Sequence, residues 1–167
     1  MADTISTDIT STIIESSCKF IGSYAFEGCN NLTNIEIPNS VKSIGGSAFY
    51  GCSSLTNIEI PNTITSIEDR VFFLCSSLTS VTIPNSVTSI GEKVFYGCKN
   101  LSNVYYKGTA RDSVKISISL YNDNLTNATI YYYSETEPAL NADGTDYEGN
   151  YWHYDTDGKT PVVWKKD

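Results

Sequence analysis

The sequence predicts an α/β solenoid built mostly from short β-strands with a single helical turn in each repeat, followed by a small C-terminal β-hairpin. Three observations support this fold class. The chain repeats itself every 23 residues, each repeat contains a segment in which apolar and polar residues alternate, and each repeat closes with an apolar-rich segment too short for a full helix. A single repeat cannot bury its apolar residues alone, so neighbouring repeats are expected to stack.

Columns of identical residues define the period. An apolar residue, an aromatic residue, a cysteine and an Ile-Pro pair recur in step: Leu32, Leu55, Leu78 and Leu101; Phe26, Phe49, Phe72 and Phe95; Cys29, Cys52, Cys75 and Cys98; Ile37, Ile60 and Ile83 before Pro38, Pro61 and Pro84. A divergent earlier copy begins near Ile9, because IIESSCKFIG at residues 13–22 aligns with EIPNSVKSIG at residues 36–45. Four copies and an incomplete fifth therefore fill residues 9–108.

Each repeat divides into three predicted segments. The first, such as LTNIEI at residues 32–37, alternates as a strand does and ends at a proline, which cannot donate a ladder hydrogen bond. The second is a short extended piece around Val41 and Ile44. The third, such as SAFYGC at residues 47–52, is long enough only for one helical or 3₁₀ turn. The repeated Leu, Ile, Phe and Cys residues are expected to form ladders inside the solenoid.

The pattern LTNIEIPNSVKSIGGSAFYGCSS at residues 32–54 resembles the 23-residue leucine-rich repeat of the BspA-like class, which is found in bacterial surface proteins. The resemblance covers residues 9–108 and extends less strictly through residues 103–133, which are similar to the segment that often ends such arrays. Relatives commonly have a Trp near Ser113 or Val114 in that segment, and this chain has none. The resemblance implies a leucine-rich-repeat solenoid whose first strands line a concave side, and a role in adhesion to host or neighbouring-cell proteins.

The chain accordingly divides into four predicted parts. Residues 1–8 form an N-terminal extension, residues 9–108 the leucine-rich repeats, and residues 109–133 a C-terminal cap in which LTNATI repeats the Leu-to-Ile spacing once more. Residues 134–167 form an acidic, aromatic-rich tail. In that tail an Asp-Gly turn between YWHY and TPVVW predicts a β-hairpin, because Gly accepts a positive φ.

The charge distribution narrows the choice of partners. Residues 1–133 carry 11 acids and 8 bases, and residues 134–167 carry 8 acids and 3 bases, which gives the net charge of -8. Nucleic acid and anionic membranes are recognised by clustered Lys and Arg, which this chain lacks. No apolar run is long enough to span a bilayer, and MADTISTDIT is unlike a signal peptide. The composition favours an exported bacterial surface protein, so we expect an extracellular or cell-surface location and an excerpt of a longer protein.

The cysteines are predicted to be structural. Four of the five lie 23 residues apart, whereas zinc ligands come in close pairs, and Cys18 takes the position that Val41 has in the next repeat. Neighbouring rungs are close enough for disulfides, but parallel side chains place the sulfurs poorly for bonding. Free buried thiols are expected, and no cofactor or metal is predicted.

No catalytic set of residues is visible in the sequence. The single histidine, His153, could act as a general base, but no nucleophile and orienting acid can be assigned to it, and a half-buried strand residue explains it better. DTDG at residues 155–158 and NADGTD at residues 141–146 are oxygen-rich, yet neither fits the EF-hand spacing. The chain is therefore predicted not to be an enzyme.

Two surfaces are candidates for binding. The outward residues of the first strands would form a continuous polar concave face: Asn34, Glu36, Asn57, Glu59, Ser80, Thr82, Asn103 and Tyr105. Such a face suits protein recognition through many modest hydrogen bonds. Alternatively, it is a solvated sheet face that repeats because the unit was duplicated. The tail aromatics could stack on sugars: Tyr151, Trp152, Tyr154 and Trp164. The predicted function is a protein-binding or adhesion module. The alternative is a structural spacer whose aromatic tail contacts carbohydrate or cell wall.

Overall fold

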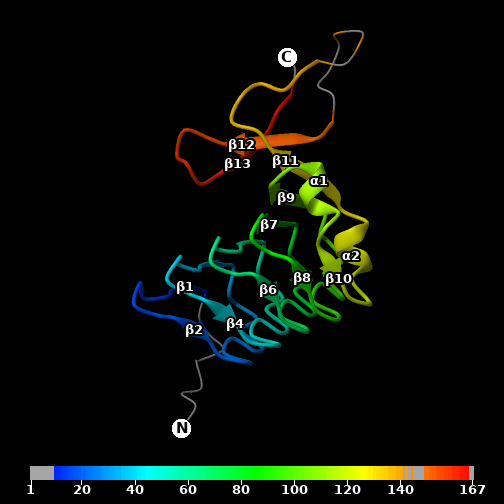
Figure 1. Ribbon diagram of the computed structural model, residues 1–167. Helices are drawn as coiled ribbons and strands as arrows, with labels where there is room; N and C mark the ends of the chain where they lie inside the picture. The colour runs from blue at the N-terminus through cyan, green and yellow to red at the C-terminus, as the bar shows by residue number, and fades with distance from the viewer. Residues whose placement is uncertain (1–9, 141, 143, 145–148, 166–167) are drawn as a thin grey trace.

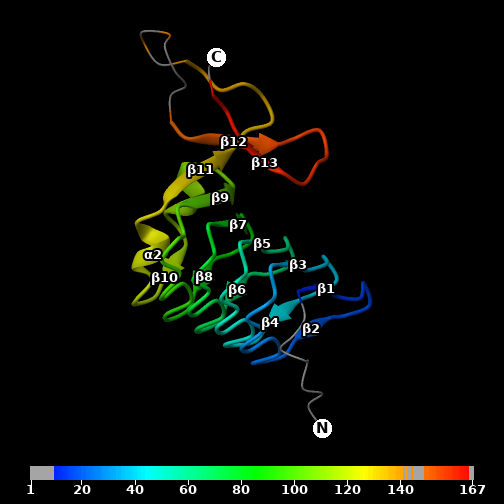
Figure 2. The ribbon, with the colours of Figure 1, turned by 180° about the vertical axis from the view of Figure 1, so that it is seen from behind.

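The chain winds into a stack of similar coils that carries a hairpin at its C-terminal end (Figure 1). The computed structural model describes residues 10–140, 142, 144 and 149–165, so the predicted extension at residues 1–8 lies outside the described residues. Each coil contributes a first strand and a shorter second strand to two sides of the stack, as both views show (Figure 2). The predicted leucine-rich-repeat solenoid is confirmed.

The first strands of successive coils pair in parallel and in register, except at one step of the stack. They are β1 (Ser11–Ile13), β3 (Asn34–Glu36), β5 (Asn57–Glu59), β7 (Ser80–Pro84), β9 (Asn103–Lys107) and β11 (Thr129–Tyr133). β1 pairs with β3, and β5, β7, β9 and β11 follow one another in a second sheet, so β3 and β5 belong to separate sheets. Register steps between β5, β7 and β9 equal the period of the sequence, so identical positions lie directly side by side.

The second strands repeat this arrangement on a smaller scale. They are β2 (Phe20–Ile21), β4 (Ser43–Ile44), β6 (Ser66–Ile67), β8 (Ser89–Ile90) and β10 (Ser117–Ile118). β2 pairs with β4, and β6, β8 and β10 form a three-stranded parallel sheet. The isoleucine of each strand from β2 to β8 points inward and is buried, which explains why this position recurs in the sequence.

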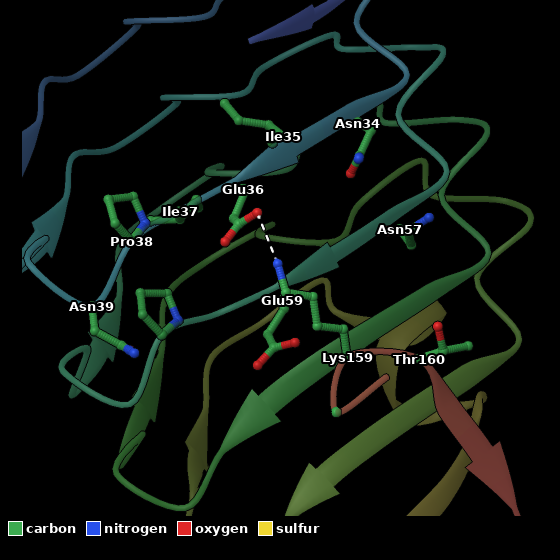
Figure 3. A pocket seen from close by; sticks show the side chains of 12 residues that line it. Asn34, Ile35, Glu36, Ile37, Pro38, Asn39, Asn57, Glu59, Lys159 and Thr160 are labelled. Carbon is green, nitrogen blue, oxygen red and sulfur yellow. Dashed lines mark hydrogen bonds and ion pairs between the residues drawn. The ribbon is translucent and has the colours of Figure 1, made fainter. Parts of the chain in front are cut away.

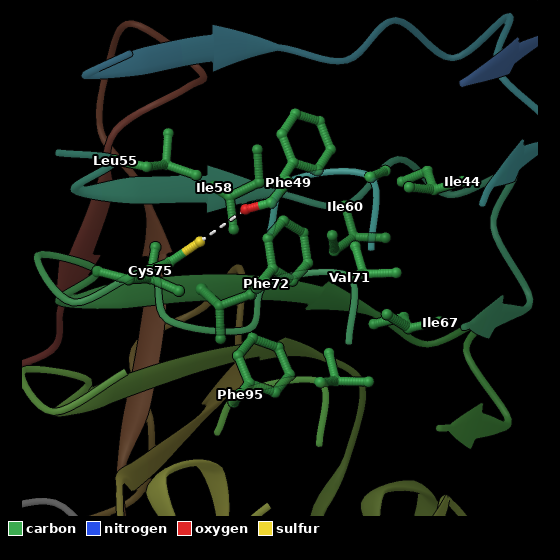
Figure 4. Packing of buried hydrophobic residues seen from close by; sticks show 14 of the residues in the cluster. Ile44, Phe49, Leu55, Ile58, Ile60, Ile67, Val71, Phe72, Cys75 and Phe95 are labelled. Atoms are coloured by element: carbon green, nitrogen blue, oxygen red, sulfur yellow. Dashed lines mark hydrogen bonds between the residues drawn. The ribbon is translucent and has the colours of Figure 1, made fainter. Parts of the chain in front are cut away.

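The interior consists of ladders of identical side chains (Figure 4). The rings of Phe26, Phe49, Phe72 and Phe95 stack with centroid distances of 5.0, 5.5 and 5.6 Å. Three of these four rings are fully buried, as are Leu55 and Leu78 beside them. Stacking of like residues buries apolar area in every coil, and that burial is the main driving force for closing the array.

The third segment of each coil is a run of turns, and no helix is formed there, in contrast to the single helical turn expected locally. Alternate amides bond outside the segment: the N–H of Phe49 donates to the carbonyl of Val71 in the next coil at 2.9 Å, whereas that of Cys52 donates back to Phe49 at 3.2 Å. The segment contains a residue in the left-handed backbone conformation, Ser47, whose φ is 58°. Arg70 and Lys93, one and two periods later, have the same conformation. Bonds between coils take the place of bonds within a helix.

The glycine of the Ile-Gly pair marks a close approach between coils. A Cβ atom added to Gly91 would lie 2.8 Å from the backbone nitrogen of Asp69 in the preceding coil, and at Gly45 it would lie 2.5 Å from that of Ser23. These contacts are shorter than a carbon atom tolerates against backbone, so the absence of a side chain lets the coils stack.

The cysteine ladder has a polar function as well as an apolar one. All five cysteines are free thiols, as predicted. The Sγ atoms of Cys52, Cys75 and Cys98 donate to the phenylalanine carbonyl of the preceding coil at 3.1 to 3.2 Å. Burial raises the pKa of Cys52 and of Cys98 to about 12. The thiol thus adds a second hydrogen bond to a carbonyl that already accepts from a backbone N–H, which valine or alanine could not do.

Residues 109–133 form one further, irregular coil that contains α1 (Ala110–Ser113), β10, α2 (Asp123–Thr126) and β11. Asn122 in this coil is 3% exposed, and its side chain makes the hydrogen bonds that the backbone of a further coil would make. The side-chain carbonyl of Asn122 accepts from the N–H of Phe95 at 3.1 Å, and its amide donates to the carbonyl of Gly91 at 2.9 Å. The asparagine therefore satisfies groups that the last regular coil would leave unpaired.

Candidate binding face

The concave face comprises the outward residues of the first strands, and the structure brings them together in rows. The row at the start of the strands runs from Asn57 through Ser80 to Asn103, and the next outward row runs from Glu59 through Thr82 to Tyr105. Asn34 and Glu36 occupy the same positions in β3. In β3 and β5 these side chains are exposed while the intervening isoleucine is buried, which is the alternation that the sequence predicted.

One member of the concave face is not accessible. Thr82 is only 4% exposed, so the prediction that it contributes an open contact is wrong. The residue lies directly between Glu59 and Tyr105 in the sheet register, and both neighbours carry longer side chains. A short side chain in a row of long ones is covered by them.

The C-terminal hairpin extends the first-strand sheet and packs against it. It consists of β12 (Tyr151–Tyr154), which pairs in parallel with β11, and β13 (Pro161–Val163), which pairs antiparallel with β12. The predicted hairpin is thus present. Its turn is closed by Asp157, whose carboxylate accepts from the backbone N–H groups of Lys159 and Thr160 at 2.7 and 2.8 Å, and by Gly158 with a φ of +67°.

Trp152 anchors the hairpin to the solenoid. Its ring is fully buried among Tyr105, Tyr133 and Tyr154, with centroid distances of 5.4, 5.1 and 5.0 Å. Its Nε1 donates to the carbonyl of Tyr106 at 3.1 Å. The prediction that Trp152 is an aromatic contact for carbohydrate is therefore wrong, because neither face of the ring is open to a ligand.

The other tail aromatics are half-buried. The ring of Trp164 lies 4.3 Å from that of His153, and its Nε1 donates to the carbonyl of Ser134 at 3.1 Å. Tyr151 and Tyr154 belong to β12, and Tyr154 packs on Trp152. These side chains hold the tail together, and a role in sugar binding stays a prediction for Tyr151, Tyr154 and Trp164. Tyr147 and most of NADGTD lie outside the described residues.

A charged group joins the hairpin to the concave face. Oε1 of Glu59 accepts from Nζ of Lys107 at 2.5 Å and from the hydroxyl of Tyr154 at 3.0 Å. The Lys107 ammonium also lies 5.1 Å from the centre of the Tyr154 ring. Burial, reinforced by the negative charge of Glu59, raises the pKa of Tyr154. The carboxylate of Glu59 is therefore already paired with a cation within the molecule, and sequence reasoning missed Lys107 as its partner.

Beyond this group, the turn of the hairpin lies over the N-terminal half of the face (Figure 3). Nζ of Lys159 lies 3.4 Å from Oε2 of Glu36, a residue 123 positions earlier in the chain. A hollow of about 570 Å³ separates the turn from the strands and is lined mostly by polar residues. Its lining includes Asn34, Glu36, Asn39, Asn57, Glu59, Lys159 and Thr160. The sequence alone gave no signal that Lys159 and Thr160 belong to this site.

No candidate metal site occurs in the described part of the chain. No group of three or more His, Cys, Asp or Glu in this part of the chain could hold a metal ion. His153 is a half-buried residue of β12, as predicted, and its Nδ1 lies 2.8 Å from the carbonyl of Tyr154. None of the helices in the described residues is long and apolar enough to cross a bilayer.

Comparisons with known proteins agree with this geometry. The family model for the BspA type leucine-rich repeat region matches residues 5–131 as six copies. A leucine-rich cell surface protein from Faecalibacterium prausnitzii is 32% identical, with a TM-score of 0.53, over 66% of this chain and 35% of its own. A leucine-rich repeat protein from T. pallidum is also 32% identical, with a TM-score of 0.60, over 72% of this chain and 55% of its own. The chain thus spans about half or less of these structures. No curated protein matches it significantly.

Proposed function

The chain belongs to the BspA-type leucine-rich repeat family, and we propose that it is a non-enzymatic protein-binding or adhesion module of a bacterial cell-surface protein. The leucine-rich repeat fold typically serves as a scaffold. The description of the F. prausnitzii relative as a cell surface protein supports the proposed extracellular location. The expected partners are surface or matrix proteins of a host or of neighbouring cells.

The observation that carries this proposal is the hollow between the N-terminal half of the concave face and the hairpin turn. Asn34, Glu36, Asn57 and Glu59 project from two neighbouring strands into one hollow of about 570 Å³. Amides and carboxylates that project from regular strands can form several hydrogen bonds to a partner without a change of the backbone. Because regular strands position the Cα atoms of these residues, the strands need not rearrange for binding at this surface.

The proposal is tested by binding to immobilised matrix proteins, mucins and bacterial glycans. The full chain is compared with the double variant Asn34→Ala, Asn57→Ala, and with a control double variant at and just before the second strand β4, Lys42→Ala, Ser43→Ala. All four positions are exposed, so the variants should keep the native thermal midpoint. Loss of protein binding in the first variant alone is expected.

Other outcomes would contradict the proposal. Binding that survives the change at Asn34 and Asn57 would place the contact elsewhere on the chain. Binding to glycans that is lost in Tyr151→Ala would favour carbohydrate recognition by the tail instead. Failure to bind any member of the panel would favour a spacer that presents other domains.

A further inference from the structure

The hairpin turn places a lysine of the chain on the surface that the proposed function assigns to a partner. Lys159 reaches Glu36 from the turn between β12 and β13, and the two side chains are 73% and 75% exposed. An ion pair this exposed gains little energy, because water screens it and both side chains lose freedom when they pair. Another cation can therefore easily replace Lys159 at the Glu36 carboxylate.

The two carboxylates of the site differ in this respect. Glu59 accepts from Lys107 and from Tyr154, and Tyr154 is packed against the buried Trp152. These contacts belong to the base of the hairpin and hold it in place. Glu36 has only the exposed ammonium of Lys159 among its described ionic contacts. Displacing Lys159 would free the Glu36 carboxylate while the hairpin stays docked.

The hollow between the turn and the strands has the chemistry to receive a long cationic side chain. Glu36 supplies a carboxylate on its wall, and Asn34, Asn39 and Asn57 supply amide carbonyls. The guanidinium group of Arg can satisfy a carboxylate and a neighbouring carbonyl together, and Lys can do so less completely. The net charge of -8 also attracts a basic partner from a distance.

We propose that the concave face binds a Lys- or Arg-bearing segment of a protein partner at Glu36, and that Lys159 competes for the same carboxylate from within the chain. This inference rests on the proposed function and specifies the chemistry of the partner. The hairpin turn thereby weakens the binding of basic ligands that cannot displace Lys159. A partner binds when its own cation and the surrounding hydrogen bonds outcompete Lys159.

The test uses an arginine- and lysine-containing nonapeptide and the same peptide with each basic residue replaced by glutamine. Their affinities are measured for the full chain, for Lys159→Ala, for Glu36→Gln, and for Lys165→Ala as a matched control on the same tail. The basic peptide should bind Lys159→Ala about 1.5-fold to 5-fold more tightly than the unaltered chain, the range that exposed ion pairs reach. It should bind Glu36→Gln more weakly, and Lys165→Ala should be unchanged.

A second measurement separates displacement from misfolding. Amide resonances of Gly158 and Thr160 should shift in the same direction when the basic peptide is added and when Lys159 is replaced by alanine. Equal affinity of the peptide for the unaltered chain and for Lys159→Ala, or undiminished affinity for Glu36→Gln, would overturn the inference. If matrix proteins still require Asn34 and Asn57 in that case, the proposed function stands and only the cationic site is wrong. If neither proteins nor peptides bind, both fail.

Discussion

Replacement of Phe72 by alanine tests the ladder that holds the coils together. The ring is fully buried, and Phe49 and Phe95 stack on its two faces at 5.5 and 5.6 Å. Truncation of a buried phenylalanine costs about 3 to 5 kcal/mol, which already includes aromatic contacts worth about 0.5 to 1.5 kcal/mol each. Because Phe72 loses two such contacts, we expect a cost of about 4 to 5 kcal/mol. Within the described part of the chain Phe26 stacks on one ring, that of Phe49, so Phe26→Ala should cost about 1 kcal/mol less.

Equilibrium unfolding in urea, followed by circular dichroism, measures both costs. The slope of the free energy of unfolding against urea should stay unchanged, since an altered slope would mean that the array no longer unfolds as one unit. A cost below about 1 kcal/mol for Phe72→Ala would contradict the interior position of the ring. A larger cost for Phe26→Ala than for Phe72→Ala would contradict the argument from stacking.

Three further predictions concern separate features of the solenoid. At neutral pH a thiol reagent should label Cys18, which is half-buried, within minutes and leave Cys52 and Cys98 unlabelled, because burial raises their pKa to about 12; mass spectrometry counts the labels, and all five should react in denaturant. Gly91→Ala should lower the thermal midpoint, because its Cβ would press on the backbone of the preceding coil; an unchanged midpoint would show that the coils can separate freely. Hydrogen bonds from Lys115 and Thr109 lower the pKa of Asp112 to about 2. A pKa below the unfolded value of about 3.9 means that this stabilisation is present above that pH and is lost as the pH falls toward about 2. Carboxyl NMR titration measures the pKa directly, and a value near 3.9 would contradict the proposed hydrogen bonds.

The repeated part of the fold could be predicted from the sequence because every structural signal occurs several times. One Ile-Pro pair or one Phe-x-x-Cys segment would be ambiguous, but three copies of the first and four of the second at a fixed spacing determine which residues share a column. The inward and outward positions of β3 and β5 follow from that spacing alone. The turns of the third segment could not be predicted in the same way, because their amides bond to the next coil and local sequence shows no partner.

The unrepeated part was less predictable for a related reason. Asn122 ends the ladder of hydrogen bonds, yet its sequence context differs little from that of other asparagines in the chain. The contacts of Tyr154 with Glu59 and of Lys159 with Glu36 join residues 95 and 123 positions apart. Only a tertiary arrangement brings such residues together, so the tail aromatics suggested a ligand surface where Trp152 in fact fills an internal contact.

A repeated surface has difficulty specifying one binding position. Glu36 and Glu59, and likewise Asn34 and Asn57, occupy equivalent places in neighbouring coils, so a partner that fits one coil would nearly fit the next. Specificity requires a difference in affinity between such registers. The hairpin supplies that difference, because it engages Glu59 through Tyr154 and leaves Glu36 facing only an exposed lysine. A partner bound at the concave face would therefore be directed to one coil by the hairpin, which does not share the repeat.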